Sequence, residues 1–293
     1  MKESSVSSTS LLIARGVLLA DATPALRPLL VNGSVAFTRR LLDVAGPSPN
    51  FELALRHRFL RRIIFGAERL LLPGVLLHWL TRKRLLDDYA HEALAAGCRQ
   101  IVVLGAGLDT LTWRFQSKCV CLELDHPASA AFKRGAFPDG PELVEADLMQ
   151  TSAADALRAH PRFDANQPTL FIAEGLLMYL SPARGASLFS ELATVAAPGS
   201  RFAFSFMEAR AGHRIGFHNS RHLVDGWLRW RGEPFRWALG RAEMEPFLAQ
   251  HGWNLTAVGS PEEMRRRYLA PLGLDKAPLA MGEPVALAHR VAP

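Results

Sequence analysis

Short apolar runs in the second two thirds of the chain constrain its fold more than any other feature. From Gln100 onward, these runs alternate with segments of helical periodicity. This alternation is typical of an α/β fold with a mostly parallel sheet. The runs predict seven strands, at Ile101–Leu104, Cys119–Leu124, Leu143–Glu145, Thr169–Ala173, Arg201–Phe206, Trp253–Val258 and Val285–Arg290.

The connection before the last predicted strand differs from the others. It holds a short helical pattern that ends near Leu269, followed by a stretch rich in Pro and Gly. Because no full crossover helix is predicted there, we expect the last strand to be antiparallel at the edge of the sheet.

The first third of the chain has a different character. Its Leu- and Arg-rich segments recur at helical spacing and are broken by prolines and by the pair Pro73-Gly74. We therefore predict a cap of short helices over residues 11–99, ahead of an α/β core over residues 100–293. The Ser-rich residues 1–10 are expected to be disordered.

A polar segment over residues 208–236 follows the fifth predicted strand. It is interrupted by glycines and carries His213, His218 and His222. A long insert after a sheet strand is typical of a lid or substrate loop, and we expect that role here.

Composition argues against several classes of function. The formal net charge of +6 favours acidic ligands, but no Lys/Arg block is interleaved with aromatic residues as in nucleic-acid sites. Three cysteines without framework spacing argue against a disulfide-rich secreted domain. The arginines between Arg56 and Arg62 sit among apolar residues, which is typical of a solvated helix face.

The longest apolar stretch lies at residues 63–80. Glu68, Arg69 and Pro73 interrupt it, which indicates two packed helices and not a membrane span. Leucines 70–80 could equally form a core face or a dimer surface, so the oligomeric state stays open. We expect a cytoplasmic protein that has neither nucleic acid nor a membrane as its partner.

The turn after the first predicted strand is the first candidate ligand site. Gly105-Ala106-Gly107 follows a buried strand, and the absent side chains allow a ligand to approach the backbone. Asp125 stands about twenty residues further on, the distance at which a carboxylate reaches two ribose hydroxyls. Together the two features indicate a nucleoside.

Two residues separate the possible nucleosides. A dinucleotide site usually has a third glycine where this chain has Thr110, and Asp109 would repel a pyrophosphate but tolerate a sulfonium or an amino group. We therefore favour S-adenosylmethionine (SAM) over NAD as the cofactor. An NAD-linked oxidoreductase is the alternative.

Acids also end the next two predicted strands. Asp147 follows the third strand, where it would accept a hydrogen bond from the adenine amine while Leu148 covers the ring. Glu174 follows the fourth strand. Three acids at one edge of a sheet are hard to explain by stability, because neighbouring carboxylates repel one another.

A resemblance to a known family is carried by five strings, at Thr81 to Asp88, Val103 to Thr110, Glu123 to Pro127, Ala146 to Leu148 and Glu174 to Leu180. Together they resemble the leucine carboxyl methyltransferase superfamily, above all its bacterial branch of SAM-dependent O-methyltransferases, often associated with polyketide or other secondary metabolism. The resemblance spans roughly Ser8 to Tyr268. It implies a class I methyltransferase with a Rossmann-like, mostly parallel sheet of seven strands, an antiparallel last strand, an N-terminal helical cap and an insert after strand five.

The resemblance also implies roles for single residues. Arg82 is similar to the arginine that pairs with the SAM carboxylate, and Arg84 is the second claimant. Leu85 and Leu86 depart from the branch, which usually has an aromatic residue there. The residues expected around the cofactor are Arg82, Gly105, Gly107 and Asp109 near the methionyl part, Asp125 at the ribose, Asp147 and Leu148 at the adenine, and Glu174 near the amino group.

The catalytic residues stay open. Methyl transfer is an in-line displacement, and a carboxylate acceptor needs no general base whereas a hydroxyl does. The candidates are Tyr179, His213 and His218, and no residues stand at metal-ligand spacing.

We expect O-methylation of a carboxylate or an acidic hydroxyl on a small acidic metabolite. The cap and the insert are where members of the family differ in substrate, so the phosphatase C-terminal leucine is not carried over to this chain. A protein that binds SAM without transferring methyl groups is the remaining alternative.

Overall fold

A single sheet of seven strands organises the chain. A computed structural model describes residues 7–210 and 215–291, and its strand order is β3-β2-β1-β4-β5-β7-β6. Strands β1 to β5 pair in parallel, and β7 runs antiparallel between β5 and β6. The bounds are β1 Gln100–Leu104, β2 Val120–Asp125, β3 Glu142–Glu145, β4 Thr169–Ala173, β5 Arg201–Ser205, β6 Trp253–Gly259 and β7 Val285–Arg290.

All seven predicted strands are confirmed, each within one residue at either end, and so is the antiparallel direction of the last strand. Its predicted place at the edge of the sheet is wrong, because β7 lies between β5 and β6 and β6 forms the edge. The central strands are buried on both faces, which explains why the sequence shows continuous apolar runs there and not alternation.

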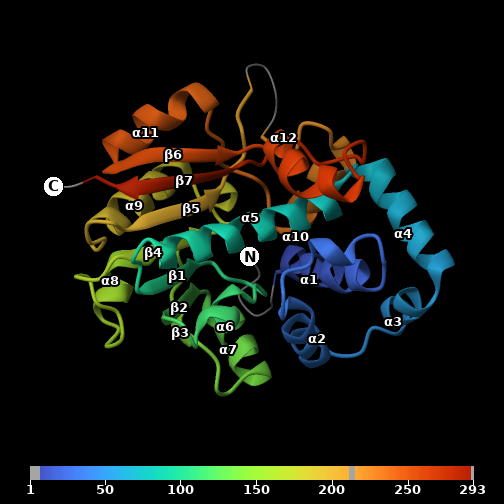
Figure 1. Cartoon of the computed structure of the whole chain (residues 1–293), viewed down its shortest axis with the longest axis horizontal. Coiled ribbons are helices and arrows are strands. Elements are labelled where there is room, and N and C mark those ends of the chain that lie inside the picture. The colour runs from blue at the N-terminus through green and yellow to red at the C-terminus, as the bar shows by residue number, and fades with distance from the viewer. Residues whose placement is uncertain (1–6, 211–214, 292–293) are drawn as a thin grey trace.

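Helices cover both faces of the sheet (Figure 1). On one face lie α8 (Ala153–Arg158), α9 (Pro182–Ala193) and α11 (Met244–Gln250), which pack on Val102, Phe171 and Phe202. On the other face lie α5 (Val75–Ala95), α6 (Leu111–Phe115) and α12 (Pro261–Met264), which pack on residues such as Ile101 and Leu170. The remaining α-helix of the core, α7 (Pro127–Ala136), contacts β3.

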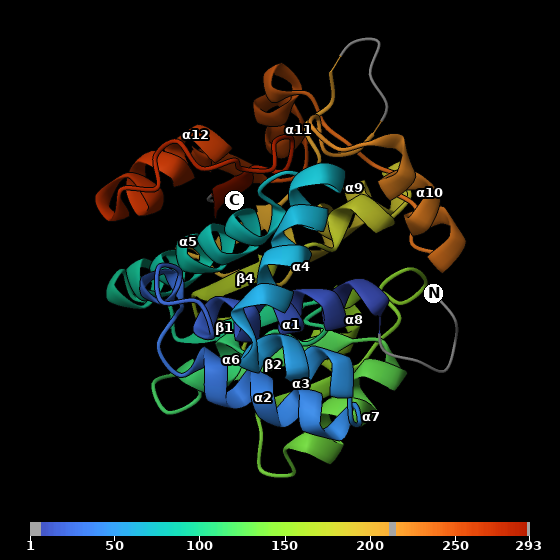
Figure 2. The same cartoon turned by 90° about the vertical axis from the view of Figure 1, so that its right-hand side faces the viewer.

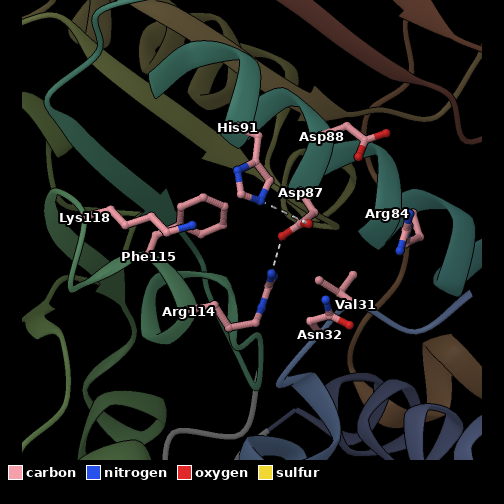
Figure 3. A pocket seen from close by; sticks show the side chains of 9 residues that line it. All are labelled: Val31, Asn32, Arg84, Asp87, Asp88, His91, Arg114, Phe115 and Lys118. Atoms are coloured by element: carbon pink, nitrogen blue, oxygen red, sulfur yellow. Dashed lines mark hydrogen bonds and ion pairs between the residues drawn. The ribbon is translucent and has the colours of Figure 1, made fainter. Parts of the chain in front are cut away.

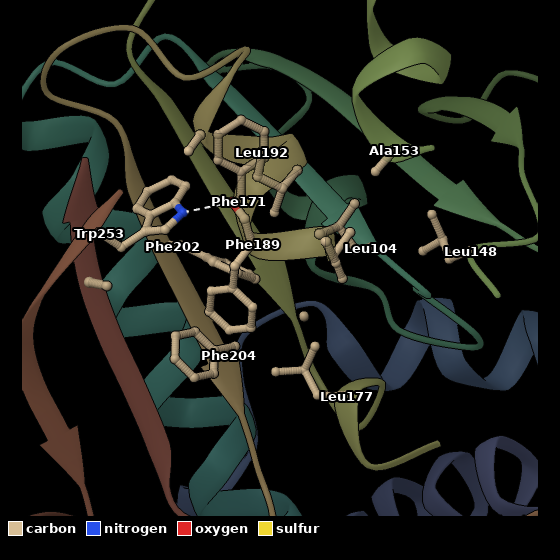
Figure 4. Close-up of a cluster of buried hydrophobic side chains, with 14 of the residues drawn as sticks. Leu104, Leu148, Ala153, Phe171, Leu177, Phe189, Leu192, Phe202, Phe204 and Trp253 are labelled. Carbon is tan, nitrogen blue, oxygen red and sulfur yellow. Dashed lines mark hydrogen bonds between the residues drawn. The ribbon is translucent and has the colours of Figure 1, made fainter. Parts of the chain in front are cut away.

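Aromatic side chains fill the core under α9 (Figure 4). Phe189 of α9 lies 4.9 Å, ring centroid to ring centroid, from both Phe202 and Phe204 of β5. Trp253 of β6 donates a hydrogen bond from its indole nitrogen to the Phe189 carbonyl at 3.0 Å. This aromatic cluster packs β5 against α9, and β5 pairs with β4 and β7, two strands whose ends lie at the site.

The N-terminal helices begin earlier than the sequence indicated. Ser7 caps α1, its side chain accepting from Ser10 N, and the helix begins at Ser8. The expectation of disorder over residues 1–10 is therefore wrong for residues 8–10, and residues 1–6 lie outside the described residues. The helices of this part are α1 Ser8–Asp21, α2 Ser34–Val44, α3 Pro49–Arg56 and α4 Arg58–Leu71.

The predicted cap over residues 11–99 is too long. Helix α5 lies within that range, yet its side chains Leu80, Leu85 and Tyr89 are buried in one cluster with Ile101 of β1. The helix therefore belongs to the sheet layer, and only α1 to α4 form the cap. No single helix in residues 7–210 and 215–291 is long and apolar enough to cross a membrane, although α4 and α5 pass that test as a pair bent by 89°.

The insert over residues 208–236 is more regular than expected. Its second half forms helix α10, His222–Arg231, which ends at Gly232 in the left-handed conformation. Phe217 and Phe235 of the insert pack with Leu72 and Val75, where α4 meets α5. The insert is thus fixed to the cap.

Candidate functional site

A cavity of about 770 Å³ opens at the carboxyl end of β1. It extends from the sheet edge between α1, α4, α5 and α10, which Figure 2 shows on one side of the molecule. Its polar floor is formed by residues from four places: the turn after β1, the start of the segment after β4, the middle of α5, and Glu283 shortly before β7. The floor residues are Arg82, Lys83, Gly105, Gly107, Asp109, Glu174, Gly175 and Glu283.

Two glycines give the turn after β1 its backbone conformation and let neighbouring side chains pack closely against it. Gly105 and Gly107 have φ values of +61° and +50°, which glycine adopts without strain. A Cβ atom added at Gly105 would lie 2.8 Å from Leu176 Cδ1, and one at Gly107 would lie 2.7 Å from Ser10 Oγ. The turn is therefore a tightly packed backbone cradle under α1, and it lines the cavity at the place where we expect a nucleoside derivative.

Asp125 anchors this turn through hydrogen bonds to its backbone. Its carboxylate accepts hydrogen bonds from Gly107 N at 2.5 Å and from His126 N at 2.7 Å. Burial raises the pKa of Asp125, while the charge of Lys133 and the two backbone N–H groups oppose that rise. The acid at the end of β2 thus fixes the cradle in position.

A network of charged side chains forms the cavity floor. Arg82, 3% exposed, donates to Glu174 Oε1 at 3.0 Å and pairs with Glu283. Lys83 lies 3.2 Å from Glu174 Oε2 and also pairs with Asp109. Three carboxylates and two cations leave one net negative charge, so the floor favours a cationic ligand.

The network favours the ionised forms of Glu283 and Asp109. Burial alone would raise the pKa of Glu283, but the Arg82 guanidinium and a hydrogen bond from His78, at 2.8 Å, lower it to about 2. Burial likewise opposes the ionisation of Asp109, yet the Lys83 ammonium holds the pKa of that carboxyl well below its ordinary value.

Most of the predicted methionyl-side residues meet at this floor. Arg82, Gly105, Gly107, Asp109 and Glu174 all line the cavity. The second claimant for the carboxylate, Arg84, instead lines a separate pocket.

That separate pocket holds about 450 Å³ and lies on another side of α5 (Figure 3). Arg84 lies over the ring of Tyr268 there, 6.0 Å from its centroid. Only the first of the two arginines thus lines the cavity.

The adenosine-side residues do not line the cavity. Asp125 lies beneath the turn, and the end of β3 follows beside it, since Ala146 N donates to the Asp125 carbonyl at 2.8 Å. Asp147 accepts from Met149 N at 3.0 Å, and Leu148 is 5% exposed within the core. Their assignment to ribose and adenine stays a prediction.

Sequence reasoning missed Lys83 and Glu283. Lys83 carries no pattern of its own apart from its place beside Arg82. Glu283 could have been found from topology, because an antiparallel strand begins at the edge where parallel strands end, and Glu283 stands two residues before β7.

Of the catalytic candidates that the structure describes, one lines the cavity and one does not. Tyr179 lines the cavity, but burial and the charge of Glu233 raise the pKa of its hydroxyl, which stays protonated at neutral pH. His218 does not line the cavity, and its Nε2 lies 3.0 Å from the Glu208 carbonyl. His213 lies outside the described residues.

Away from the floor, the cavity walls are apolar. Ile64 and Phe65 of α4, Trp79 of α5, and Val224 and Trp227 of α10 lie on them. Among the residues that the structure describes, no histidine lines the cavity, and no group of three or more His, Cys, Asp or Glu side chains could hold a metal ion.

Comparisons with known proteins agree with this geometry. Residues 47–193 match the leucine carboxyl methyltransferase family. A protein of Mycolicibacterium paratuberculosis named "Putative S-adenosyl-L-methionine-dependent methyltransferase" is 34% identical over 278 residues, which cover 86% of this chain and 85% of that protein. One of the same name from Mycobacterium marinum is 33% identical over 210 residues, 66% of this chain and 64% of its own length.

The match to the Mycobacterium marinum protein thus spans just under two thirds of that relative. A solved structure from Thermobifida fusca, titled as a "putative methyltransferase", shares the fold with a TM-score of 0.55 at 16% identity, and the match covers 80% of this chain and 89% of that one. Sheet order, cavity floor and relatives agree: the chain has the class I fold and belongs to the leucine carboxyl methyltransferase family of SAM-dependent methyltransferases.

Proposed function

We propose that this chain transfers a methyl group from SAM to an oxygen atom, a carboxylate or an acidic hydroxyl, of a small metabolite with an apolar body. The observation that carries the proposal is the cavity of about 770 Å³ at the end of β1, in which a charged floor suited to the cofactor adjoins apolar walls suited to an acceptor.

The floor residues fit the methionyl part of SAM. Arg82 would bind its carboxylate, while Glu174 and Asp109 would lie near its amino group. The net negative charge of the floor stabilises a cation, and SAM carries a sulfonium. When bound, SAM supplies a methyl group activated by that positive sulfur.

The apolar walls are suited to exclude water and to hold the acceptor. Side chains such as Trp79 and Trp227 exclude water from the space beside the floor. A dry, shaped cavity positions an acceptor oxygen in line with the methyl group and removes competition from water.

The lining residues favour an acceptor that is already an anion. Asp109, Glu174 and Glu283 are held in ion pairs, so none is a free base. Glu68, the remaining carboxylate on the wall, accepts from Leu76 N at 3.3 Å at the start of α5. A substrate carboxylate is already ionised, so no base has to remove a proton from it before it accepts the methyl group. We therefore place carboxylates first among the possible acceptors.

Turnover with methyl-labelled SAM tests the proposal. The panel holds carboxylic acids, phenols, amines and thiols with short and long apolar bodies, and we expect label in an ester or aryl ether of an apolar member. Label found only on nitrogen or sulfur acceptors would contradict O-methylation. SAM binding without any transfer across the panel would favour a protein that only binds SAM.

A further inference from the structure

Helix α4 exposes its apolar side chains to solvent. None of its 14 residues is buried, and Phe59, Ile63 and Leu70 are 67%, 53% and 56% exposed. At 3.6 residues per turn these three lie within about 40° of one another around the helix. A helix in a globular protein normally buries such a stripe against a core.

Arginines flank this stripe on one side. Arg58, Arg62 and Arg69 are exposed, and the same helical geometry places them about 60° to 100° away from Phe59. A row of guanidinium groups beside an exposed apolar stripe is the pattern of a helix that lies in the plane of an anionic membrane surface.

Helix α10 repeats the pattern. Leu223 and Trp230 are 70% and 75% exposed, and the exposed Arg231 lies 4.9 Å from the centroid of the Trp230 ring. Tryptophan beside arginine is typical of segments anchored at a lipid headgroup region. Arg221 N donates to the Leu71 carbonyl at 3.0 Å, so α10 begins where α4 ends.

The same two helices form the wall of the cavity. Ile64 and Phe65 of α4 and Val224 and Trp227 of α10 line it, on the sides of the helices that face inward. Figure 2 shows both helices at the side of the molecule toward which the cavity extends. A molecule held at the exposed stripes is therefore one helix width from the acceptor space.

We propose that the exposed stripes of α4 and α10 dock the protein onto an anionic lipid bilayer, from which an apolar acceptor passes into the cavity. The docking departs from the expectation that no membrane is a partner. The delivery of an acceptor rests on the proposed methyl transfer, whereas the docking does not. A second copy of the chain is the less suitable occupant, because α4 helices paired antiparallel would bring their arginine rows together, whereas anionic headgroups neutralise the arginines.

Vesicle flotation of the full chain tests the docking. We expect binding to phosphatidylcholine vesicles that contain one third phosphatidylglycerol, little binding to phosphatidylcholine alone, and loss of most binding in high salt. The triple variant Phe59→Ser/Ile63→Ser/Leu70→Ser should bind the anionic vesicles roughly tenfold less or worse. Arg62→Gln/Arg69→Gln should reduce binding to the anionic vesicles only.

A matched control keeps the test specific. Val44→Ser/Leu272→Ser removes two apolar side chains that are 46% and 38% exposed and belong to elements other than α4 and α10, and it should bind vesicles like the wild type. Circular dichroism and titration with S-adenosylhomocysteine establish that each variant is folded.

Three outcomes would overturn the docking: no binding of the wild type to either vesicle, equal loss in the control variant, or a wild-type dimer that the triple variant abolishes while vesicles bind neither protein. The last outcome would assign the stripe to a second copy. Methyl transfer that persists without vesicle binding leaves the proposed function intact, and vesicle binding without methyl transfer contradicts only that function.

Discussion

Glu283 joins the last strand of the sheet to the cofactor floor. It is 1% exposed, and it binds Arg82 with one carboxylate oxygen and His78 with the other. Removing the charge of one member of a buried ion network leaves its partners uncompensated, which costs more than the loss of a surface pair. The residue therefore combines a structural and an electrostatic role.

The pH dependence of stability tests that role. The pKa of Glu283 is about 2 in the folded chain and is expected near 4.5 when unfolded. Its stabilisation is then fully present above about pH 4.5 and is lost as the pH falls toward 2. We predict that Glu283→Gln unfolds at lower urea concentration at pH 7 and that its stability falls less steeply with acid than that of the wild type.

Urea unfolding measured at several pH values checks this prediction. Glu145→Gln is the control, since Glu145 pairs with Arg134 at the surface, where both side chains are about half exposed. Parallel acid profiles for the wild type and Glu283→Gln would disprove the role of this carboxyl.

Arg82 offers a second test at the scale of one residue. A lysine there keeps the charge but cannot bridge Glu174 and Glu283 while also binding a carboxylate. We predict that Arg82→Lys weakens binding of S-adenosylhomocysteine tenfold or more, since a hydrogen bond to a charged group contributes roughly 1.5–3 kcal/mol. Arg84→Lys, in the separate pocket, is the control and should bind like the wild type.

Among the secondary-structure elements and turns, the glycine turn after β1 allows a test by substitution. Gly105→Ala puts a Cβ atom 2.8 Å from Leu176 at a φ of +61°, so we expect lower stability and at least tenfold weaker cofactor binding. Gly135→Ala, at an exposed position in α7 with nothing within 4 Å of an added Cβ, should stabilise the chain by about 0.5–1 kcal/mol. Thermal unfolding with and without ligand measures both effects. Unchanged ligand binding in Gly105→Ala would show that the turn is not the cradle.

The strands could be predicted from the sequence because a strand that is buried on both faces of the sheet has a continuous run of apolar residues. Thr169–Ala173 and Val285–Arg290 were predicted to the residue for that reason. The glycine turn and its following acids were found because each directly follows such a run.

The helices were harder to predict. The amphipathic pattern of α5 shows that one face is buried but not on what, so the helix was assigned to the cap. In α10, Gly226 and several polar residues weaken the helical pattern in the sequence. The helix is stabilised by its packing against the cap. The pairing of Arg82 with Glu283 joins residues 201 positions apart, and only the topology of the sheet brings them together.

At the scale of the whole molecule, the cavity depends on parts of the chain that are distant in sequence. Thr9 of α1 donates to Glu233 of the insert at 2.6 Å, which connects the first helix to the far wall. A ligand that binds between these parts stabilises all of them together, by about 2.7 kcal/mol at a concentration one hundred times its Kd. We predict that S-adenosylhomocysteine raises the thermal unfolding midpoint by several degrees in one cooperative transition. A shift for only part of a split transition would show that the cap and the sheet do not share the ligand.

Isothermal titration of the purified chain with SAM and S-adenosylhomocysteine, beside NADH, shows whether the cavity at the end of β1 is a SAM site. We predict one site per chain for the two sulfur nucleosides, weaker binding in Arg82→Lys, and no binding of NADH. A folded protein that binds neither SAM nor S-adenosylhomocysteine, or that binds NADH at the same site, would contradict this prediction.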